Sequence, residues 1–256
     1  MSAHFEQFKT LHHSGNLFIL PNAWDAKSAQ VLQANTFPAV ATSSMAVAGS
    51  LGYNDGEDMP FSDYLFVINR ILSAINIPLS VDMEMGYGSS DEKILENVLR
   101  VARLGVAGIN IEDSTIVQSK RVLKDAVFAR TIEYIRKGLS SEKLELFINV
   151  RCDTYIADIE DRQTETARRL KLYEDSGADG IFLPFITLPE DIAAAVDNTR
   201  LPLNVMSFPG LPDLDRLHQL GVKRVSMGPW LFTKTYTSAD TISQAIITQQ
   251  SLAPLL

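Results

Sequence analysis

The chain has 256 residues, of which 46% are hydrophobic and 21% are charged, and it carries a formal net charge of −8 with a pI of about 5.0. This composition is that of an ordinary globular protein, and the length suits one domain of barrel size or two smaller ones. The acidic balance argues against extensive nucleic-acid binding, which depends on neutralising phosphates. The single cysteine, Cys152, excludes an internal disulfide and a multi-cysteine metal site.

The first residues contain no basic segment followed by an apolar one, and no apolar run reaches the ~18 residues that a membrane span needs. We therefore expect a cytoplasmic protein without a membrane or nucleic-acid partner. The four histidines, His4, His12, His13 and His218, lie in helical patterns. They leave little material for a zinc hydrolase or a Ser-His-Asp site.

Short β-branched segments alternate with helical patterns along the chain, and the strand ends recur at intervals of about 30 residues, the size of one βα unit. This alternation predicts an α/β structure with a parallel sheet, and eight strands close into a (β/α)8 TIM barrel. An open, doubly wound sheet shares the alternation, but the turn over 21–25 lacks the glycine-rich phosphate loop typical of that fold. The expected strands are Leu17–Leu20, Ala39–Ser43, Leu79–Met83, Gly108–Glu112, Leu146–Arg151, Gly180–Pro184, Leu203–Met206 and Arg224–Met227, and the expected helices are Asp25–Asn35, Phe61–Ile75, Asp91–Leu104, Asp125–Lys137, Glu160–Ser176 and Pro189–Asp197.

No linker or low-complexity segment divides the chain, so we expect a single domain over residues 1–256, with an N-terminal helix over about 3–13 and C-terminal helices over about 229–250. Two recurring local features support the barrel. Glycine separates a helix from the following strand at Gly105, Gly177 and Gly221, as a left-handed cap does. Proline precedes three strands, at Pro38, Pro78 and Pro202, where no ladder hydrogen bond is lost.

Acidic residues follow three consecutive predicted strands, at the end of the barrel where active sites form. Asp82 and Glu84 are two residues apart and share a face of the third strand, while Glu112 and Asp113 end the fourth and Asp153 follows the fifth. Crowded carboxylates repel each other unless a cation is present. An all-oxygen ligand set suits Mg²⁺ or Mn²⁺. Alternatively, these acids cap helices or pair with Lys and Arg.

Arg151 ends the fifth strand beside these acids, and its planar guanidinium suits a substrate carboxylate bound through two hydrogen bonds. The alternative is a structural ion pair. Thr42, Ser43 and Ser44 offer hydroxyl and N–H groups that can hold a carboxylate, although such a triplet also serves as a turn or cap. Cys152 is interpreted as a small buried residue, because no histidine accompanies it and nearby acids disfavour the thiolate.

These motifs, in this order, resemble the isocitrate lyase/phosphoenolpyruvate mutase superfamily over nearly the whole chain. The third-strand motif and the Ile-Glu-Asp segment are together highly specific. The matching segments are Pro21-Asn22-Ala23-Trp24-Asp25, Ala41-Thr42-Ser43-Ser44, Ser50-Leu51-Gly52-Tyr53-Asn54-Asp55, Pro78-Leu79-Ser80-Val81-Asp82-Met83-Glu84-Met85-Gly86-Tyr87-Gly88, Gly108-Ile109-Asn110-Ile111-Glu112-Asp113-Ser114 and Ile148-Asn149-Val150-Arg151-Cys152-Asp153.

The resemblance implies a Mg²⁺-dependent enzyme that makes or breaks C–C or P–C bonds next to a 2-oxo acid through an enolate. It implies that Asp82 binds the metal, that Asp55, Glu84 and Glu112 hold its water molecules, and that Arg151, Ser43 and Ser44 bind substrate. It also implies a homo-oligomer, either a homotetramer or a homodimer.

The sequence departs from the superfamily after the fourth strand, where the lyases have a lid with a Lys-Lys-Cys-Gly-His or Lys-Arg-Cys-Gly-His motif. Residues 114–123 contain neither cysteine nor histidine. We expect this stretch to be a lid whose Lys120 and Arg121 act in catalysis, and the alternative is a solvated loop. At the sixth strand, Phe182-Leu183-Pro184-Phe185 replaces the acid or histidine of the superfamily.

The chain therefore resembles the broad mutase-like subgroup, and a lyase or hydrolase acting on a small 2-oxo or 2-hydroxy acid by C–C cleavage or decarboxylation is favoured. P–C bond chemistry by a mutase or hydrolase, and a carboxylate-binding barrel without turnover, are the alternatives.

Overall fold

The structure, a computed structural model, describes residues 3–117, 120–123, 125–157 and 159–256, and only the backbone at 116, 117 and 120–123. Within this part of the chain, nine strand segments form one parallel sheet in the order β1-β11-β10-β9-β8-β5-β4-β3-β2. The segments are β1 Phe18–Leu20, β2 Asn22–Ala23, β3 Val40–Thr42, β4 Leu79–Asp82, β5 Gly108–Glu112, β8 Phe147–Arg151, β9 Gly180–Leu183, β10 Leu203–Met206 and β11 Arg224–Ser226.

The sheet closes on itself at Pro21. β1 pairs with β11 and β2 pairs with β3, so the two edges of the sheet are consecutive pieces of one strand that proline interrupts. The Pro21 carbonyl still accepts a hydrogen bond of 2.8 Å from the Ala41 amide, which joins the two pieces to β3. Counted in this way the barrel has eight strands, and the predicted (β/α)8 architecture is confirmed.

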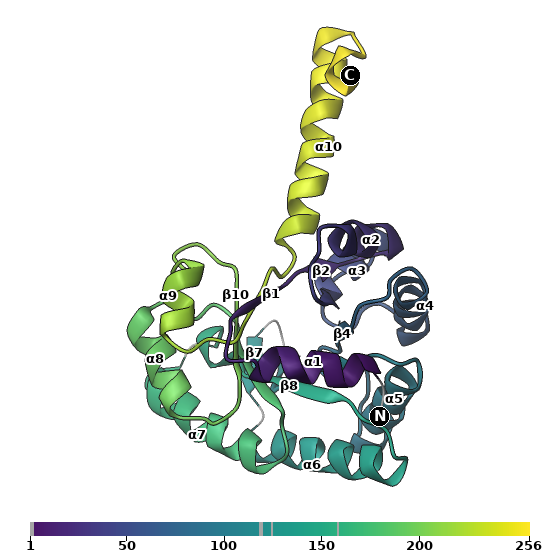
Figure 1. The fold of residues 1–256 in the computed structure, drawn as a ribbon. Helices are drawn as coiled ribbons and strands as arrows, with labels where there is room; N and C mark the ends of the chain where they lie inside the picture. Colours follow the sequence, from purple (N-terminus) through teal and green to yellow (C-terminus); the bar gives the residue numbers. More distant parts are fainter. Residues whose placement is uncertain (1–2, 118–119, 124, 158) are drawn as a thin grey trace.

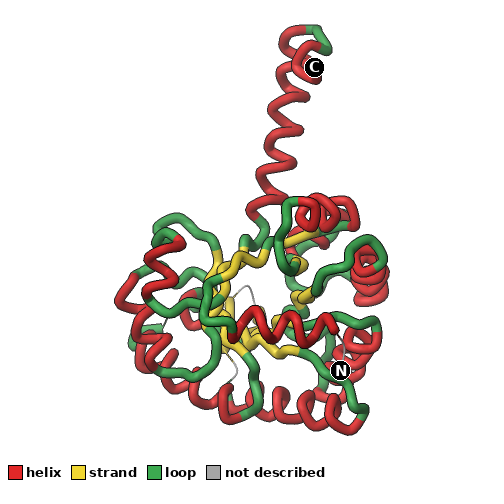
Figure 2. Tube along the Cα trace, viewed as in Figure 1, coloured by secondary structure: helices red, strands yellow, loops and turns green. Residues whose placement is uncertain are grey.

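Helices surround the barrel on the outside, as Figures 1 and 2 show. Asp25 and Ser90 cap the first turns of the helices that they precede, because each side chain accepts a backbone N–H three residues on. Gly105, Gly177 and Gly221 have positive φ, as expected for left-handed caps. The helices are α1 Ala3–His13, α2 Ala26–Ala34, α3 Ser44–Leu51, α4 Phe61–Leu72, α5 Asp91–Arg103, α6 Ala126–Ser141, α7 Arg162–Asp175, α8 Pro189–Asp197, α9 Leu214–Gln219 and α10 Trp230–Gln249, with 3₁₀ turns at Asp153–Tyr155 and Ala253–Leu255.

α3 occupies a stretch that we expected to be a loop. It contains no charged residue, and its exposed positions include Met45 and Leu51, so it lacks the polar face and the helical period that identify the other helices. Ser43 caps its start, Gly52 ends it with a φ of 84°, and Ala46 and Val47 are buried. The tertiary contacts of this segment, rather than its pattern, make it helical, and they bring its N-terminus to the end of β3.

α1 closes the N-terminal end of the barrel. Phe5 and Phe8 pack with Phe18, Leu20 and Phe147, of which Phe18 and Phe147 begin their strands. Gly108 permits this approach, since a Cβ at that position would lie 2.7 Å from the Phe8 ring. The opposite, C-terminal end of the barrel remains accessible and holds the candidate site.

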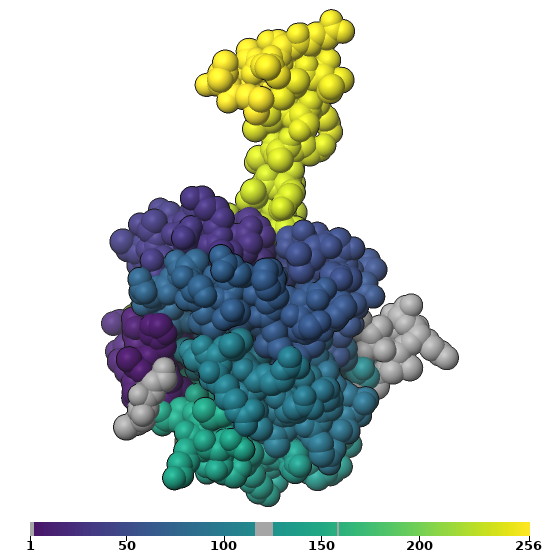
Figure 3. All heavy atoms as spheres, turned by 90° about the vertical axis from the view of Figure 1, so that its right-hand side faces the viewer, coloured from purple at the N-terminus to yellow at the C-terminus, as the bar shows by residue number. Residues whose placement is uncertain are grey.

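α10 stands away from the barrel, as Figures 1 and 3 show. It is one helix of 20 residues, where we expected several, and none of its residues is buried. None of the helices in the described ranges is both long enough and apolar enough to cross a membrane.

Candidate active site

A cavity of about 400 Å³ lies at the carboxyl ends of the barrel strands, where barrel active sites form. One part of its wall is polar and comes from the strand ends and from the segments that follow them, and the other part is apolar. The polar lining residues are Asn22, Ser43, Ser44, Asp55, Asp82, Asn110, Arg151 and Ser226, and the apolar ones are Met45, Ile156, Phe182, Pro184, Phe185, Met206, Phe208, Pro229 and Trp230, with Gly228 and Thr233 completing the lining.

Asp82, at the end of β4, is held by the start of α3. The backbone N–H and the hydroxyl of Ser44 donate to Asp82 Oδ2 at 3.3 and 3.0 Å, and the same hydroxyl lies 3.3 Å from Asp55 Oδ1. A helix N-terminus favours a nearby carboxylate because its N–H groups and its dipole both point toward it. The chain thus fixes Asp82 and Ser44 together in the cavity wall.

Thr42 does not line the cavity and lies behind Asp82. Its side chain is fully buried, and its Oγ1 accepts from the Asp82 backbone N–H at 3.0 Å. Tyr64 donates its one hydroxyl hydrogen to the Asp82 carbonyl, so in the 2.6 Å contact between the two hydroxyls Thr42 is the donor. The hydroxyl hydrogen of Thr42 is thus donated to Tyr64. Thr42 therefore stabilises the end of β4, and we no longer expect it to bind substrate directly.

Glu84 and Glu112 are buried below the cavity rim and do not line it. Glu84 has a φ of 47°, and its carboxylate accepts from the Glu57 amide at 3.0 Å and the Tyr87 hydroxyl at 2.7 Å. Burial, followed by the charges of Asp82, Asp55 and Glu112, raises the pKa of Glu84 to about 8 despite the hydrogen bond from Tyr87. Desolvation and the charge of Asp82 also raise the pKa of Asp55. The acids therefore repel one another.

Arg151, at the end of β8, is clamped between two carboxylates and lines the cavity. Its Nη1 lies 2.8 Å from Glu112, and its Nε donates to Asp153 at 2.7 Å. Burial alone lowers the pKa of Arg151, but the charges of Glu112, Asp153 and Asp82 raise it above its usual value, so the guanidinium stays charged. The ion pair that we considered as an alternative is thus present, and it orients the side chain at the cavity.

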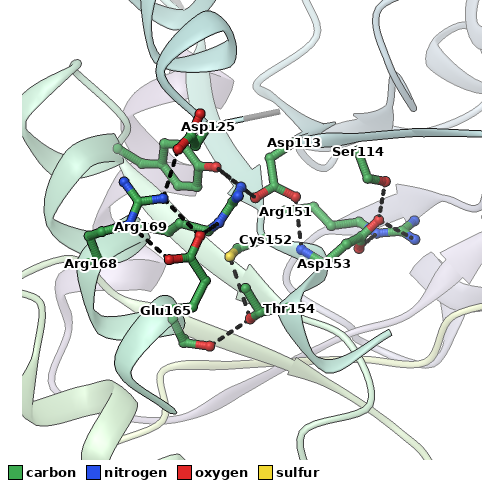
Figure 4. Close-up of polar contacts among 12 residues, drawn as sticks. Asp113, Ser114, Asp125, Arg151, Cys152, Asp153, Thr154, Glu165, Arg168 and Arg169 are labelled. Carbon is green, nitrogen blue, oxygen red and sulfur yellow. Dashed lines mark hydrogen bonds and ion pairs between the residues drawn. The ribbon is translucent and has the colours of Figure 1, made fainter. Parts of the chain in front are cut away.

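Figure 4 shows a second buried network behind Arg151. Asp113 accepts from the Asp153 amide at 2.9 Å and, with its other oxygen, from Arg169 at 2.8 Å and Tyr173 at 2.6 Å. Asp113 therefore points away from the cavity and is not one of the rim acids. Burial and the charge of Asp113 raise the pKa of Cys152, in keeping with the expected inert, buried thiol.

The expected lid, residues 114–123, contains an antiparallel hairpin of β6 Ser114–Val117 and β7 Lys120–Leu123. The segment is thus more regular than the loop we expected. It is attached at its start, where the Ser114 hydroxyl donates to Asp153 at 2.5 Å. The side chains of Lys120 and Arg121 lie outside the described residues, so their catalytic role stays a prediction.

The residues around the cavity fit a hard divalent cation. Asp82, Asp55, Glu84 and Glu112 are all oxygen donors, and their mutual repulsion would be relieved by positive charge. Among the described residues, no three His, Cys, Asp or Glu side chains converge closely enough to form a ready-made metal cage. Mg²⁺ commonly binds through one or two carboxylates and keeps several waters, so this open arrangement suits it.

Several lining residues were missed by sequence reasoning. Asn22 lies at the end of the first barrel strand. Its side-chain Oδ1 accepts from the backbone N–H groups of Met227 and Gly228, and its side-chain Nδ2 donates to the backbone carbonyl of Thr42. It thereby ties the last strand to β3. Asn22 and Ser226 both lie at strand ends, which is the position that identified the acidic residues. Their side chains are neutral, so no cluster of charge in the sequence marked them. Phe208 lies in the connection after β10, and Trp230 is the first residue of α10.

Comparisons with known proteins agree with the barrel fold and identify the family. Residues 8–247 match the phosphoenolpyruvate phosphomutase family model. An uncharacterized Mycobacterium tuberculosis protein is 35% identical over 93% of this chain and 88% of its own length, and an oxaloacetate decarboxylase of Pseudomonas entomophila is 25% identical over 86% and 77%. The crystal structure of a Burkholderia cenocepacia protein, provisionally named a phosphonomutase, superposes with a TM-score of 0.88 at 33% identity, covering 94% of this chain and 99% of that one. The chain therefore belongs to the phosphoenolpyruvate phosphomutase family, within the isocitrate lyase superfamily of lyases and phosphonomutases.

Proposed function

We propose that the protein is a Mg²⁺- or Mn²⁺-dependent lyase or hydrolase that acts on a small 2-oxo or 2-hydroxy carboxylic acid through an enolate, by C–C cleavage or decarboxylation. The observation that carries this proposal is the convergence of a fixed guanidinium, Arg151, with Asp82 and Ser44 in one cavity. A cation site and an anion site side by side suit a substrate whose negative charge moves onto an oxygen during the reaction.

Arg151 would bind the substrate carboxylate or the developing enolate oxygen, because its clamp by Glu112 and Asp153 fixes the guanidinium before substrate arrives. Ser43 caps α3, and its oxygen accepts from the Ala46 amide. Its hydroxyl hydrogen has no acceptor among the described residues and would donate to a substrate carboxylate at the N-terminus of α3. Ser44 would contact the same group while holding Asp82.

Asp82 would hold the metal directly, and Asp55, Glu84 and Glu112 would bind its water molecules. When bound, Mg²⁺ would supply positive charge next to the oxygen on which the enolate charge develops. Glu84 and Glu112 are held in place for this role by Tyr87 and Arg151.

The test is a screen of oxaloacetate, methylisocitrate, phosphonopyruvate and citramalate with and without Mg²⁺, in the wild type and in Asp82→Ala. We expect metal-dependent turnover of one of these acids, and metal-dependent thermal stabilisation in the wild type only. Unchanged metal affinity in Asp82→Ala, with normal folding by circular dichroism, would show that the ion binds elsewhere.

Two other functions remain candidates. P–C bond chemistry is favoured by the family match and by the phosphonomutase-named neighbour. A carboxylate-binding barrel without turnover is favoured by the missing Cys-Gly-His lid. Mg²⁺-dependent exchange of the C3 protons of pyruvate with D₂O, followed by NMR, separates an enolate-forming enzyme from a binding protein.

We also propose that the protein is cytoplasmic and assembles as a homodimer or homotetramer. α10 has no buried residue and exposes Tyr236 and Ile247, and a helix without packing is marginal in water. Tyr236→Glu combined with Ile247→Glu should therefore reduce the mass measured by light scattering, and a wild-type monomer would refute the proposal.

A further inference from the structure

The candidate cavity has an apolar half that the proposed chemistry does not use. Its polar side chains come mainly from the ends of β3, β4, β5 and β8, which are neighbours in the barrel. Most of the apolar side chains come from the next strands, β9 and β10, and from the turn into α10, whereas Met45 belongs to α3 and Ile156 follows β8. Phe182 is the register neighbour of Arg151, so the change from charged to apolar occurs between adjacent strands.

The aromatic side chains of this half form a continuous wall. The rings of Phe185 and Phe208 meet edge to face with centroids 4.5 Å apart, and the ring of Phe208 lies 6.2 Å from that of Trp230. The Trp230 indole N–H donates to the Ser207 carbonyl at 2.7 Å, which fixes the ring. The wall is therefore organised without a ligand and presents ring surfaces to the cavity.

The backbone at Phe185 supports a role for this wall. Phe185 has a φ of 62°, in the left-handed region that large side chains rarely adopt. Such a conformation persists where the surrounding structure maintains it, and residues of this kind are enriched at functional sites. Here the unusual backbone follows the end of β9 and brings the ring onto Phe208 in the cavity wall.

A cavity of about 400 Å³ is much larger than a three- or four-carbon acid and falls in the range of pockets for larger organic ligands. A carboxylate seated against Phe182 and Phe208 would lose water and gain only ring surface, which is unfavourable. An alkyl or aryl group in the same place would be removed from water and would strengthen binding.

We propose that the substrate is a 2-oxo or 2-hydroxy acid with a bulky apolar substituent, branched aliphatic or phenyl, which packs on the wall of Phe182, Phe185, Phe208 and Trp230. This inference rests on the proposed function, because it takes the acid group to be bound at Arg151 and Asp82. It makes the aromatic wall the element that determines substrate specificity.

The test is calorimetric titration of the full chain, with Mg²⁺ present, against pyruvate, 2-oxobutanoate, 2-oxopentanoate, 4-methyl-2-oxopentanoate, phenylpyruvate and oxaloacetate. The dissociation constant should fall about fourfold for each methylene buried. Phenylpyruvate should bind more tightly than oxaloacetate. A flat series, or tighter binding of oxaloacetate than of every apolar analogue, would overturn the inference.

Phe208→Ala tests the wall itself. The ratio of pyruvate to phenylpyruvate dissociation constants should fall about tenfold or more, the effect of losing a large apolar contact. Phe66→Ala is the matched control, because Phe66 is an exposed aromatic residue on α4 that does not line the cavity. An equal ratio in the wild type and in Phe208→Ala would exclude the wall as the binding surface.

The titrations separate this inference from the proposed reaction, because they report binding and not turnover. A steep series without turnover of any acid would support the ligand class and refute the proposed reaction. A flat series with Mg²⁺-dependent turnover of oxaloacetate would refute only the ligand class. Absence of binding by every acid in the series would overturn both.

Discussion

Replacing Asp153 by Asn should destabilise the protein and misplace Arg151. The Asp153 carboxylate is fully buried, and it accepts from Arg151 at 2.7 and 3.3 Å and from the Ser114 hydroxyl at 2.5 Å. Asn removes the charge and places an NH₂ group against these donors. Breaking a buried ion pair costs about 3–5 kcal/mol. Because Asn keeps one acceptor oxygen, we expect a loss of about 2–3 kcal/mol, near the value of a charged hydrogen bond.

Urea denaturation of Asp153→Asn, Arg151→Met and the double variant measures this interaction. We expect a coupling free energy of about 1–3 kcal/mol, since each single variant already removes the Arg151–Asp153 interaction and the double variant cannot lose it again. Glu96→Gln is the control. The Lys93–Glu96 pair has side chains 48% and 56% exposed, against 18% and 0% for Arg151 and Asp153. Its loss should cost under about 1 kcal/mol.

The same variant tests the positioning of Arg151. If Asp153 orients the guanidinium, Asp153→Asn should weaken binding of 2-oxo acids while leaving Mg²⁺ binding unchanged. A cost in Asp153→Asn no larger than that in Glu96→Gln, together with zero coupling to Arg151→Met, would refute the reasoning.

The remaining predictions concern pH, the hairpin and substrate choice. Burial, followed by the charge of Arg224, lowers the pKa of His12 well below 6.5, so the unfolded chain binds an extra proton below that pH. Stability should be full above about pH 6.5 and fall by up to about 1.4 kcal/mol per pH unit below it. His12→Gln should remove this slope and the exposed His13→Gln should not, whereas equal slopes in both would contradict the reasoning. Lys120→Ala with Arg121→Ala should lower kcat with normal metal binding, and unaffected kinetics would leave the hairpin without a catalytic role. Isocitrate and methylisocitrate cleavage should be ~10²–10⁴ times slower than in enzymes with a positioned lid acid, and robust turnover would overturn this expectation.

The barrel architecture could be predicted from the sequence, because it depends on local patterns that recur in each βα unit. Strands such as Leu79–Asp82 and Gly108–Glu112 appear as short apolar runs, and glycine or proline marks their boundaries. In parallel α/β structures such runs are buried on both faces, so hydrophobicity alone locates them. The same reliance on hydrophobicity explains why α3 was not predicted. A segment without a polar face shows no helical period, so its sequence does not identify it as a helix.

The candidate site was predicted as a set of charged residues, because acids at strand ends stand out against apolar strands. Asp82 and Arg151 line one cavity, as strand-end placement implies. Only the tertiary structure showed that Glu84 and Glu112 lie beneath the rim, that Thr42 accepts from the backbone of β4, and that Asp113 faces Arg169. Each of these differences depends on the direction of a side chain, which adjacent residues in the sequence do not determine.

The aromatic wall also depended on tertiary structure. Phe182 lies in β9, Phe185 and Phe208 follow β9 and β10, and Trp230 begins α10, and single aromatic residues in a sequence are typical of any core. Local propensities and periodicity thus determined the (β/α)8 barrel and the acidic end of its strands. Closure of the barrel at Pro21 brought distant loops together, and this long-range packing alone decided which side chains share the cavity.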